Sequence, residues 1–272
     1  MVEGPELLSM ALDAGASVES VYLAPGSRSV PAIAEVAGRA YDAGARLFDL
    51  APGVLERVSD TVTPQPVLAV VGLHEQKVAE LADAALVVVC VDIRDPGNAG
   101  TVMRSADASG ADGVVFCDGT VDPYNPKTVR ASAGSVFHLP VIAGGSAVDL
   151  LDQLGPGGLG LRRLGAVARG GEDYTSVDWT GRVVVVLGNE AQGLPDELIG
   201  RLEGTVTISL GGRAESLNVG VAGAVLCFEA RRQRRLVDAS SRSTMPGVDD
   251  ARNEAHAVAT DDPGELARRP GQ

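Results

Sequence analysis

Two apolar, β-branched runs constrain the fold of this chain more than any other feature. Residues 86–93 read LVVVCVDI and residues 182–187 read RVVVVL. Neither run shows the apolar–polar alternation of a strand with one wet face, so both are typical of parallel strands covered on both sides. Helix-like and strand-like segments alternate between residues 85 and 236, which predicts an α/β fold with a mainly parallel sheet.

The segments before and after this α/β region point to a second domain, a linker and a tail. Its 272 residues suffice for two domains, and residues 1–73 alternate short helix-like and strand-like segments. We therefore predict a smaller α/β domain at residues 1–75, a linker at 76–84 and the larger domain at 85–236. Residues 237–272 lack apolar periodicity and are rich in Ser, Asp, Pro and Gly, which favours a disordered acidic tail.

Composition argues against several classes of protein. No apolar run approaches the length of a membrane span and no signal-like segment opens the chain, so we expect a cytoplasmic protein without a membrane partner. The three cysteines lie in apolar runs without CxxC spacing and the three histidines are scattered, which argues against a metal site or a Ser-His-Asp triad. The formal net charge of −13 argues against non-specific nucleic-acid binding, so a nucleic-acid partner must meet a local basic patch.

The chain has no glycine-rich nucleotide-binding motif between a strand-like run and the helix-like segment that follows it, which is where such a motif binds phosphate. Residues 155–160, GPGGLG, match the pattern GxGxxG but follow a helix-like segment and precede a strand-like one, so we interpret them as a turn. After residue 93 the chain continues RDPGN. This disfavours a nucleotide-binding regulator of doubly wound fold and a class I methyltransferase.

Three polar stretches stand at equivalent places, each after a strand-like run and before a helix-like one. They read DPGNAGTVMR at 95–104, LGNEAQG at 187–193 and GGRAESLN at 211–218. Because the carboxyl ends of parallel strands meet at one edge of a sheet, we expect the three loops to converge on a ligand site.

Ordinary helix capping is the competing interpretation of these stretches. Asn98 is a plausible N-cap for a helix at 98–109, as are Ser216 and Asn218 for a helix that runs to about residue 235. The last helix has an apolar face made of Leu217, Val221, Ala224, Val225 and Phe228. Gly100 lies one turn before Arg104 and leaves its guanidinium unshadowed, so Arg104 could hold a phosphate in bidentate fashion.

At these residues the chain resembles a known family. NxGxxxR (Asn98, Gly100, Arg104), LGNExxGL (187–194) and I-x-[LM]-x(5)-SLNV (208–219) are similar to the three ordered motifs of the SpoU/TrmH family, RNA ribose 2′-O-methyltransferases of the SPOUT superfamily. The resemblance covers about residues 85–235. Residues 1–73 resemble more loosely an L30e-like RNA-binding domain. Ser209 stands where the family usually has Pro, and Gly220 where Ser is common.

The resemblance implies a fold, a cofactor and an assembly. The C-terminal part would form a deep trefoil knot, a rare exception to unknotted topology. The cofactor would be S-adenosylmethionine, and the chain would act as a homodimer with active sites at the subunit interface. The residues implied in cofactor binding are Leu187, Gly188, Ile208, Leu210, Leu217 and Asn218.

The resemblance also implies the catalytic residues, namely Arg104, Asn98, Glu190, Ser216 and Asn218. Family precedent makes Arg104 the base, although arginine is effectively always protonated in proteins. Arg104 from one subunit would approach the cofactor of the other, and our hypothesis is that it binds the phosphate beside the target ribose and orients the hydroxyl. The 2′-hydroxyl proton would then pass to a phosphate oxygen, to water or to a transiently neutral guanidine.

The RNA substrate is expected to be 23S rRNA, because an L30e-like domain reads folded RNA by shape. A tRNA methyltransferase and a non-catalytic RNA-binding protein of the same fold are the alternatives, and the enzyme could serve housekeeping or drug resistance. The candidates for the local basic patch are Arg28, Arg94, Lys127, Arg130 and Arg213.

Overall fold

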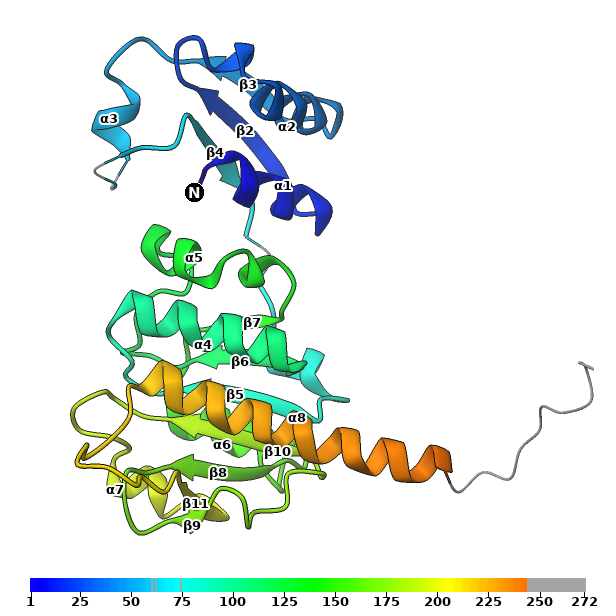
Figure 1. Ribbon diagram of the computed structural model, residues 1–272, viewed down its shortest axis with the longest axis vertical. Coiled ribbons are helices and arrows are strands. Elements are labelled where there is room, and N and C mark those ends of the chain that lie inside the picture. Colours follow the sequence, from blue (N-terminus) through cyan, green and yellow to red (C-terminus); the bar gives the residue numbers. More distant parts are fainter. Residues whose placement is uncertain (60, 62, 74, 244–272) are drawn as a thin grey trace, which may run out of the picture. The chain divides into compact units, whose positions relative to one another are not determined.

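A seven-stranded, all-parallel sheet forms the larger part of the protein, in the order β7-β6-β5-β10-β8-β11-β9 (Figure 1). The computed structural model describes residues 1–59, 61, 63–73 and 75–243. The two β-branched runs become neighbouring strands, β5 (Leu86–Cys90) and β10 (Val183–Leu187). All ten of their residues are buried, so the predicted buried parallel strands are confirmed.

Helices cover both faces of this sheet, which explains why its central strands are apolar throughout. Along β5, Val88 packs with α4 and α8, whereas Val89 packs on the opposite face with α6 and α7. The other strands are β6 (Gly113–Phe116), β7 (Val141–Ala143), β8 (Arg162–Ala166), β9 (Glu172–Asp173) and β11 (Gly204–Thr207). The helices are α4 (Pro96–Ser109), α5 (Pro126–Ser132), α6 (Ala147–Leu154), α7 (Asp196–Ile199) and α8 (Val219–Ser243).

The first 71 residues form a smaller mixed sheet, in the order β1-β4-β2-β3. Strand β4 runs antiparallel to β1 and β2, while β2 and β3 are parallel. The core on one face of the sheet includes Val21 and Leu23 of β2 packed with Leu8, Ile33 and Val36 of the two longer helices. The elements are β1 (Val2–Glu3), α1 (Pro5–Asp13), β2 (Val18–Leu23), α2 (Pro31–Asp42), β3 (Arg46–Asp49), α3 (Leu55–Val58) and β4 (Val67–Val71).

Helix α4 begins earlier than expected. Its N-cap is Asp95, whose Oδ1 accepts a hydrogen bond from the Asn98 N–H at 2.9 Å, and Pro96 follows at the first helical position. The predicted N-cap role of Asn98 is therefore wrong. Gly100 also serves packing, because a Cβ there would lie 2.4 Å from the Cβ of Ala131 on α5. The small residue allows α4 and α5 to approach closely.

Helix α8 differs from the prediction in its length. It continues to Ser243 rather than ending near residue 235, so a disordered tail beginning at 237 is wrong for residues 237–243. Residues 236–243 contain no Gly or Pro, and the first strong helix breakers are Pro246 and Gly247. The rest of the predicted tail, 244–272, lies outside the described residues.

The apolar face of α8 is also only partly buried. Val221 and Phe228 are 46% and 47% exposed, whereas Leu226, Cys227 and Ala230 are buried. The first turns are apolar on most sides, so periodicity alone does not decide which side packs. No helix among the described residues is long and apolar enough to cross a membrane.

Candidate active site

Three loops at the carboxyl ends of β5, β10 and β11 are joined by a chain of side-chain hydrogen bonds. The Asn218 Nδ2 donates to the Asn98 Oδ1 at 2.8 Å, and the Asn98 Nδ2 donates to the Glu190 Oε1 at 2.9 Å. Each of the three residues comes from a different loop or helix start, and the two hydrogen bonds join residues 120 and 92 positions apart in the chain. The structure thus brings together three of the five predicted catalytic side chains.

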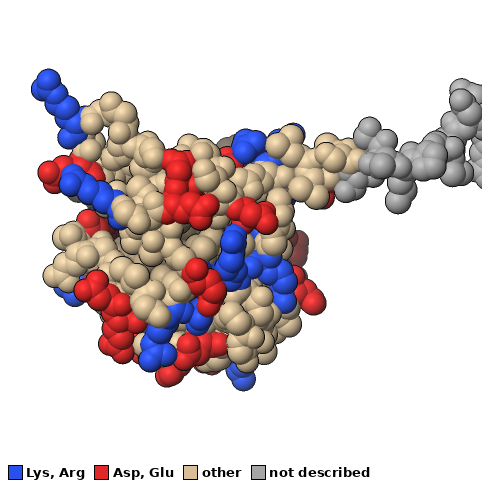
Figure 2. All heavy atoms as spheres, turned by 90° about the horizontal axis from the view of Figure 1, so that it is seen from below, with Lys and Arg blue, Asp and Glu red and all other residues tan. Residues whose placement is uncertain are grey.

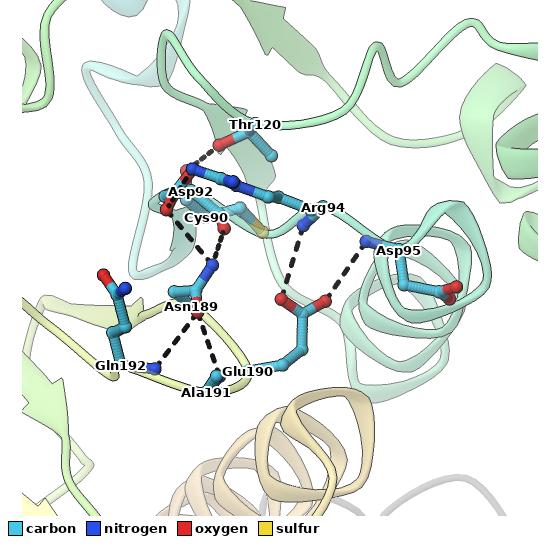
Figure 3. A network of polar contacts seen from close by, with 9 residues as sticks. All are labelled: Cys90, Asp92, Arg94, Asp95, Thr120, Asn189, Glu190, Ala191 and Gln192. Atoms are coloured by element: carbon cyan, nitrogen blue, oxygen red, sulfur yellow. Dashed lines mark hydrogen bonds and ion pairs between the residues drawn. The ribbon is translucent and has the colours of Figure 1, made fainter.

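Glu190 ties the β10 loop to the start of α4. Its two carboxylate oxygens accept hydrogen bonds from the backbone N–H groups of Arg94 at 3.4 Å and Asp95 at 3.2 Å (Figure 3). Partial burial raises the pKa of Glu190, but the Asn98 amide and the backbone N–H groups outweigh it and leave the pKa below its ordinary value. The carboxylate is therefore ionised at neutral pH and acts as a hydrogen-bond acceptor.

Asn189 and Asp92 belong to the same network, and sequence reasoning missed both. The Asn189 Nδ2 donates to the Asp92 backbone carbonyl at 2.8 Å and to its carboxylate at 3.1 Å (Figure 3). The Asn189 Oδ1 accepts from the N–H groups of Ala191 at 2.9 Å and Gln192 at 3.1 Å. Asp92 has a φ of 53°, an unusual backbone for a residue other than glycine. The only sequence signal was the place of Asn189 beside Glu190 in the second motif.

The β10 loop closes tightly upon itself. Asn189 and Gly193 exchange two backbone hydrogen bonds of 3.1 and 2.9 Å. A Cβ at Gly188 would lie 2.5 Å from the carbonyl carbon of Gly193, so only glycine fits there without opening the loop. The loop is therefore a preformed wall.

A cavity of about 370 Å³ lies beside this wall, within the size range of small-ligand sites. Of the predicted cofactor residues, Asn218 alone does not line it. The Asn218 side chain instead caps α8, with its Oδ1 accepting a hydrogen bond from the Gly220 N–H at 2.9 Å. Ser216 and Glu190 also line the cavity. The predicted cofactor residues that line it are Leu187, Gly188, Ile208, Leu210 and Leu217.

Unpaired backbone groups border the cavity. The N–H and C=O groups of Gly188, Ile208, Leu210 and Leu217 form no hydrogen bond with another described residue. Gly188 is buried, and a buried backbone group without a partner is uncommon in folded proteins. A planar heterocycle has apolar faces and a hydrogen-bonding edge, so it would fit between the apolar side chains and these free groups.

Arg104 stands apart from this cavity. It lies on the exposed side of α4, does not line the cavity, and makes no hydrogen bond or ion pair with another described residue. Its guanidinium is therefore free to bind an external anion.

The five predicted basic candidates do not form one patch of free charges. Arg28 pairs with Asp49 at 2.7 Å, Arg94 with Asp92 at 2.9 Å, and Arg130 approaches Glu3 at 3.7 Å. The two remaining candidates, Lys127 and Arg213, are exposed. Their side chains form no ion pair with another described residue.

The two departures from the family pattern have structural counterparts. The Ser209 Oγ donates a hydrogen bond to Asp173 of β9, and this bond is the main reason why the pKa of Asp173 lies below its ordinary value. A Cβ at Gly220 would lie 2.9 Å from the Thr101 side chain, so the glycine lets α8 begin close to α4.

Together, the fold and the cavity define an α/β protein that holds a small ligand at the carboxyl edge of a parallel sheet. The family model of the SpoU rRNA Methylase family matches residues 85–228, and that of the MRM3-like substrate binding domain matches residues 1–69. The chain belongs to the SpoU rRNA methylase family, which confirms the SpoU/TrmH resemblance. Its seven-stranded parallel sheet is typical of the knot domain of this family.

Relatives and solved structures agree with this placement. The chain is 33% identical over 231 residues to the 23S rRNA (guanosine(2553)-2′-O)-methyltransferase RlmP of Bacillus subtilis, covering 85% of this chain and 88% of the relative. It is similar to the AdoMet-bound structure of AviRb from Streptomyces viridochromogenes, with a TM-score of 0.78 and 27% identity over 86% of this chain and 89% of that one. An AdoMet-bound rRNA methyltransferase from Sinorhizobium meliloti gives a TM-score of 0.73 and 31% identity over 85% of each chain.

Proposed function

We propose that this protein transfers a methyl group from S-adenosylmethionine to a ribose 2′-hydroxyl of 23S rRNA, in the cytoplasm. The observation that carries the proposal is the cavity bordered by unpaired backbone groups, beside the hydrogen-bonded chain of Asn218, Asn98 and Glu190. The relative RlmP, which is named for this reaction on 23S rRNA and is 33% identical to the chain, supports the substrate. The proposed organisation is a substrate-binding domain at 1–75, a linker at 76–84 and the methyltransferase domain at 85–236.

The cofactor would lie in the cavity, with its adenine between the apolar side chains of Ile208 and Leu217. Gly188, Leu210 and Leu217 would offer backbone N–H and C=O groups to its polar edges. When bound, S-adenosylmethionine supplies a methyl group on a positively charged sulfur, which is already a good leaving group. The protein then has to position the 2′-hydroxyl in line and help it lose a proton.

Arg104 would bind the phosphate beside the target ribose and orient the hydroxyl. Its lack of an intramolecular partner supports this role, because an arginine held by a carboxylate would first have to break that ion pair. Asn98, Glu190 and Asn218 would fix the three loops, and Ser216, on the cavity wall, would contact the substrate. The proton acceptor would be a phosphate oxygen, water or a transiently neutral guanidine.

We further propose a homodimer whose active site includes Arg104 of the second subunit. Val221 and Phe228 leave an apolar strip on α8 that the described residues of the same chain do not cover. Arg104, also exposed, does not reach the cavity of its own subunit. Pairing through α8 would cover the strip and allow Arg104 to act on the neighbouring site.

Because the chain is acidic overall, individual Lys and Arg side chains would have to contact the RNA phosphates. On the face that Figure 2 shows, Lys and Arg side chains alternate with Asp and Glu side chains rather than forming a broad basic field. Lys127 and Arg213 are the best candidates for phosphate contacts, since neither is held by an acid among the described residues. Arg28, Arg94 and Arg130 would have to exchange their acidic partners for phosphates.

The proposal is tested by incubating the full chain with S-adenosylmethionine and unmodified transcripts of 23S rRNA or tRNA, then mapping 2′-O-methylated nucleotides. We expect one methylated ribose in 23S rRNA and none with Asn98→Ala, which breaks the link between Asn218 and Glu190. Methylation of tRNA alone would favour a tRNA enzyme. RNA binding without methyl transfer would favour a non-catalytic protein of the same fold.

A further inference from the structure

The small sheet carries a row of side chains across all four strands on the face opposite its core. The strand registers pair Glu3 with Leu68, Leu68 with Tyr22, and Tyr22 with Phe48. Residues paired in this way point to the same face of a sheet. The core residues of β2, such as Val21, point to the other face.

One end of this row is buried and fixed. Glu3 is 9% exposed, and its carboxylate accepts hydrogen bonds from Ser59 at 2.9 Å, Thr61 at 2.8 Å and the Gln65 N–H at 2.9 Å. Leu68, next in the row, is 2% exposed. The row is therefore held in place from the β1 side of the sheet.

The other end is an exposed aromatic stack. The rings of Tyr22 and Phe48 lie 5.3 Å apart with an interplanar angle of 17°, and Phe48 is 41% exposed. The Arg46 guanidinium lies over the Phe48 ring at 5.9 Å from its centroid. Aromatic residues make up only 3% of the chain, and the large rings of Trp179 and Phe116 are buried. Tyr41 and Phe228 are exposed as well, but among the described residues neither is in ring contact with another aromatic side chain.

The charge at this place suits an anionic partner. Arg46 makes no ion pair with another described residue. Asp49, the acid on the same strand, is occupied by Arg28 through two hydrogen bonds of 2.7 and 3.2 Å. A flat apolar ring with an adjacent free guanidinium matches a nucleotide, which combines a stacking base with a phosphate.

We propose that Tyr22, Phe48 and Arg46 form a platform on which an unpaired base of the RNA substrate stacks, with Arg46 beside its phosphate. The platform rests on the proposed function, because it identifies how the small domain holds RNA. Stacking needs no broad positive field, so it offers an acidic chain affinity that charge cannot supply. The alternative is an aromatic pair that only stabilises the edge of the sheet.

The test measures the affinity of the full chain for an unmodified 23S rRNA transcript. Phe48→Ala is expected to weaken binding about fivefold to a hundredfold, the range for loss of one stacked base. Phe48→Leu, which keeps an apolar side chain but lacks a ring, is expected to weaken RNA binding as well. Phe48→Trp, which keeps an aromatic ring, is expected to retain the wild-type affinity for RNA. Tyr41→Ala is the matched control, since Tyr41 is 66% exposed on α2 and outside the row.

Cofactor affinity and the circular dichroism spectrum are expected to stay at wild-type values in Phe48→Leu. Wild-type RNA affinity in this variant, or an equal loss in Tyr41→Ala, would overturn the platform. A wild-type protein that binds the transcript but transfers no methyl group would overturn the proposed function while leaving the platform standing.

Discussion

The two sheets of this protein leave different surfaces for ligands. The large sheet is buried under helices on both faces, so its ligand cavity is built from loops at the carboxyl edge, where backbone groups of Gly188 and Ile208 remain unpaired. The small sheet carries its core on one face and an aromatic row that ends at exposed Phe48 on the other. A tight edge suits a small ligand of fixed shape, whereas an open face suits a large flexible partner.

This difference predicts a division of work that substitutions can break. Changes at the carboxyl edge of the large sheet should affect the cofactor and chemistry, while changes on the small sheet should affect RNA affinity. Four substitutions, ordered from the largest expected effect to the smallest, sharpen the comparison.

Arg104→Ala is expected to lower the rate of methyl transfer about a hundredfold to ten-thousandfold, because the 2′-hydroxyl loses its positioning group. Stability should change by no more than about 0.5 kcal/mol, since Arg104 is exposed and has no partner among the described residues. Single-turnover kinetics and thermal unfolding measure the two effects. Near-normal turnover in Arg104→Lys would show that neither a bidentate clamp nor a guanidine base is needed.

Gly188→Ala is expected to weaken cofactor binding about fivefold to a hundredfold, because the new Cβ would meet Gly193 at 2.5 Å and force the loop open. Calorimetric titration with S-adenosylmethionine measures the change. Gly181→Ala is the control, since a Cβ there has nothing within 4 Å. Equal affinities in the two variants would contradict a cofactor held against the β10 loop.

Phe228→Asp is expected to convert a dimer into a monomer and to reduce methyl transfer, since a charge in an apolar contact is costly. Sedimentation velocity reports the oligomeric state. Val58→Asp offers a matched control, because Val58 has a similar exposure, 48% against 47% for Phe228, and lies on the small domain. A wild-type protein that is monomeric and fully active would refute the dimeric site.

Glu190→Gln is expected to have the smallest effect of the four substitutions. The effect is a change in how the free energy of unfolding depends on pH. The lowered pKa of Glu190 means that its contribution is present above its ordinary pKa and is lost as the pH falls through the lower value of the folded state. The contribution is about 1 kcal/mol or less, because the exposed carboxylate is screened by water. Denaturant titrations from about pH 7 to about pH 3 should show a shallower decline for Glu190→Gln, and parallel curves would contradict this account.

The sequence predicted those parts of the structure that depend on local pattern. Two β-branched runs identified β5 and β10, because a strand buried on both faces must be apolar throughout. The convergence of Asn98, Glu190 and Asn218 followed from the equal places of their loops after parallel strands.

Features that depend on contacts between distant segments were not predictable. The hydrogen bonds between Asn189 and Asp92 join residues 97 positions apart, and no periodicity encodes such a pairing. The packing role of Gly100 depends on the approach of α5. The exposure of Val221 and Phe228 likewise depends on which side of the apolar first turns of α8 meets the sheet.

The central claim is that the cofactor is held at the carboxyl edge of the large sheet, whereas the exposed aromatic row of the small sheet contributes much of the affinity for the RNA. Paired titrations of two variants test this claim most directly. Gly188→Ala and Phe48→Leu are each titrated with S-adenosylmethionine and with an unmodified 23S rRNA transcript. We expect Gly188→Ala to lose cofactor affinity and keep RNA affinity, and Phe48→Leu to do the reverse. Loss of both affinities in either variant, or of neither in both, would contradict the claim.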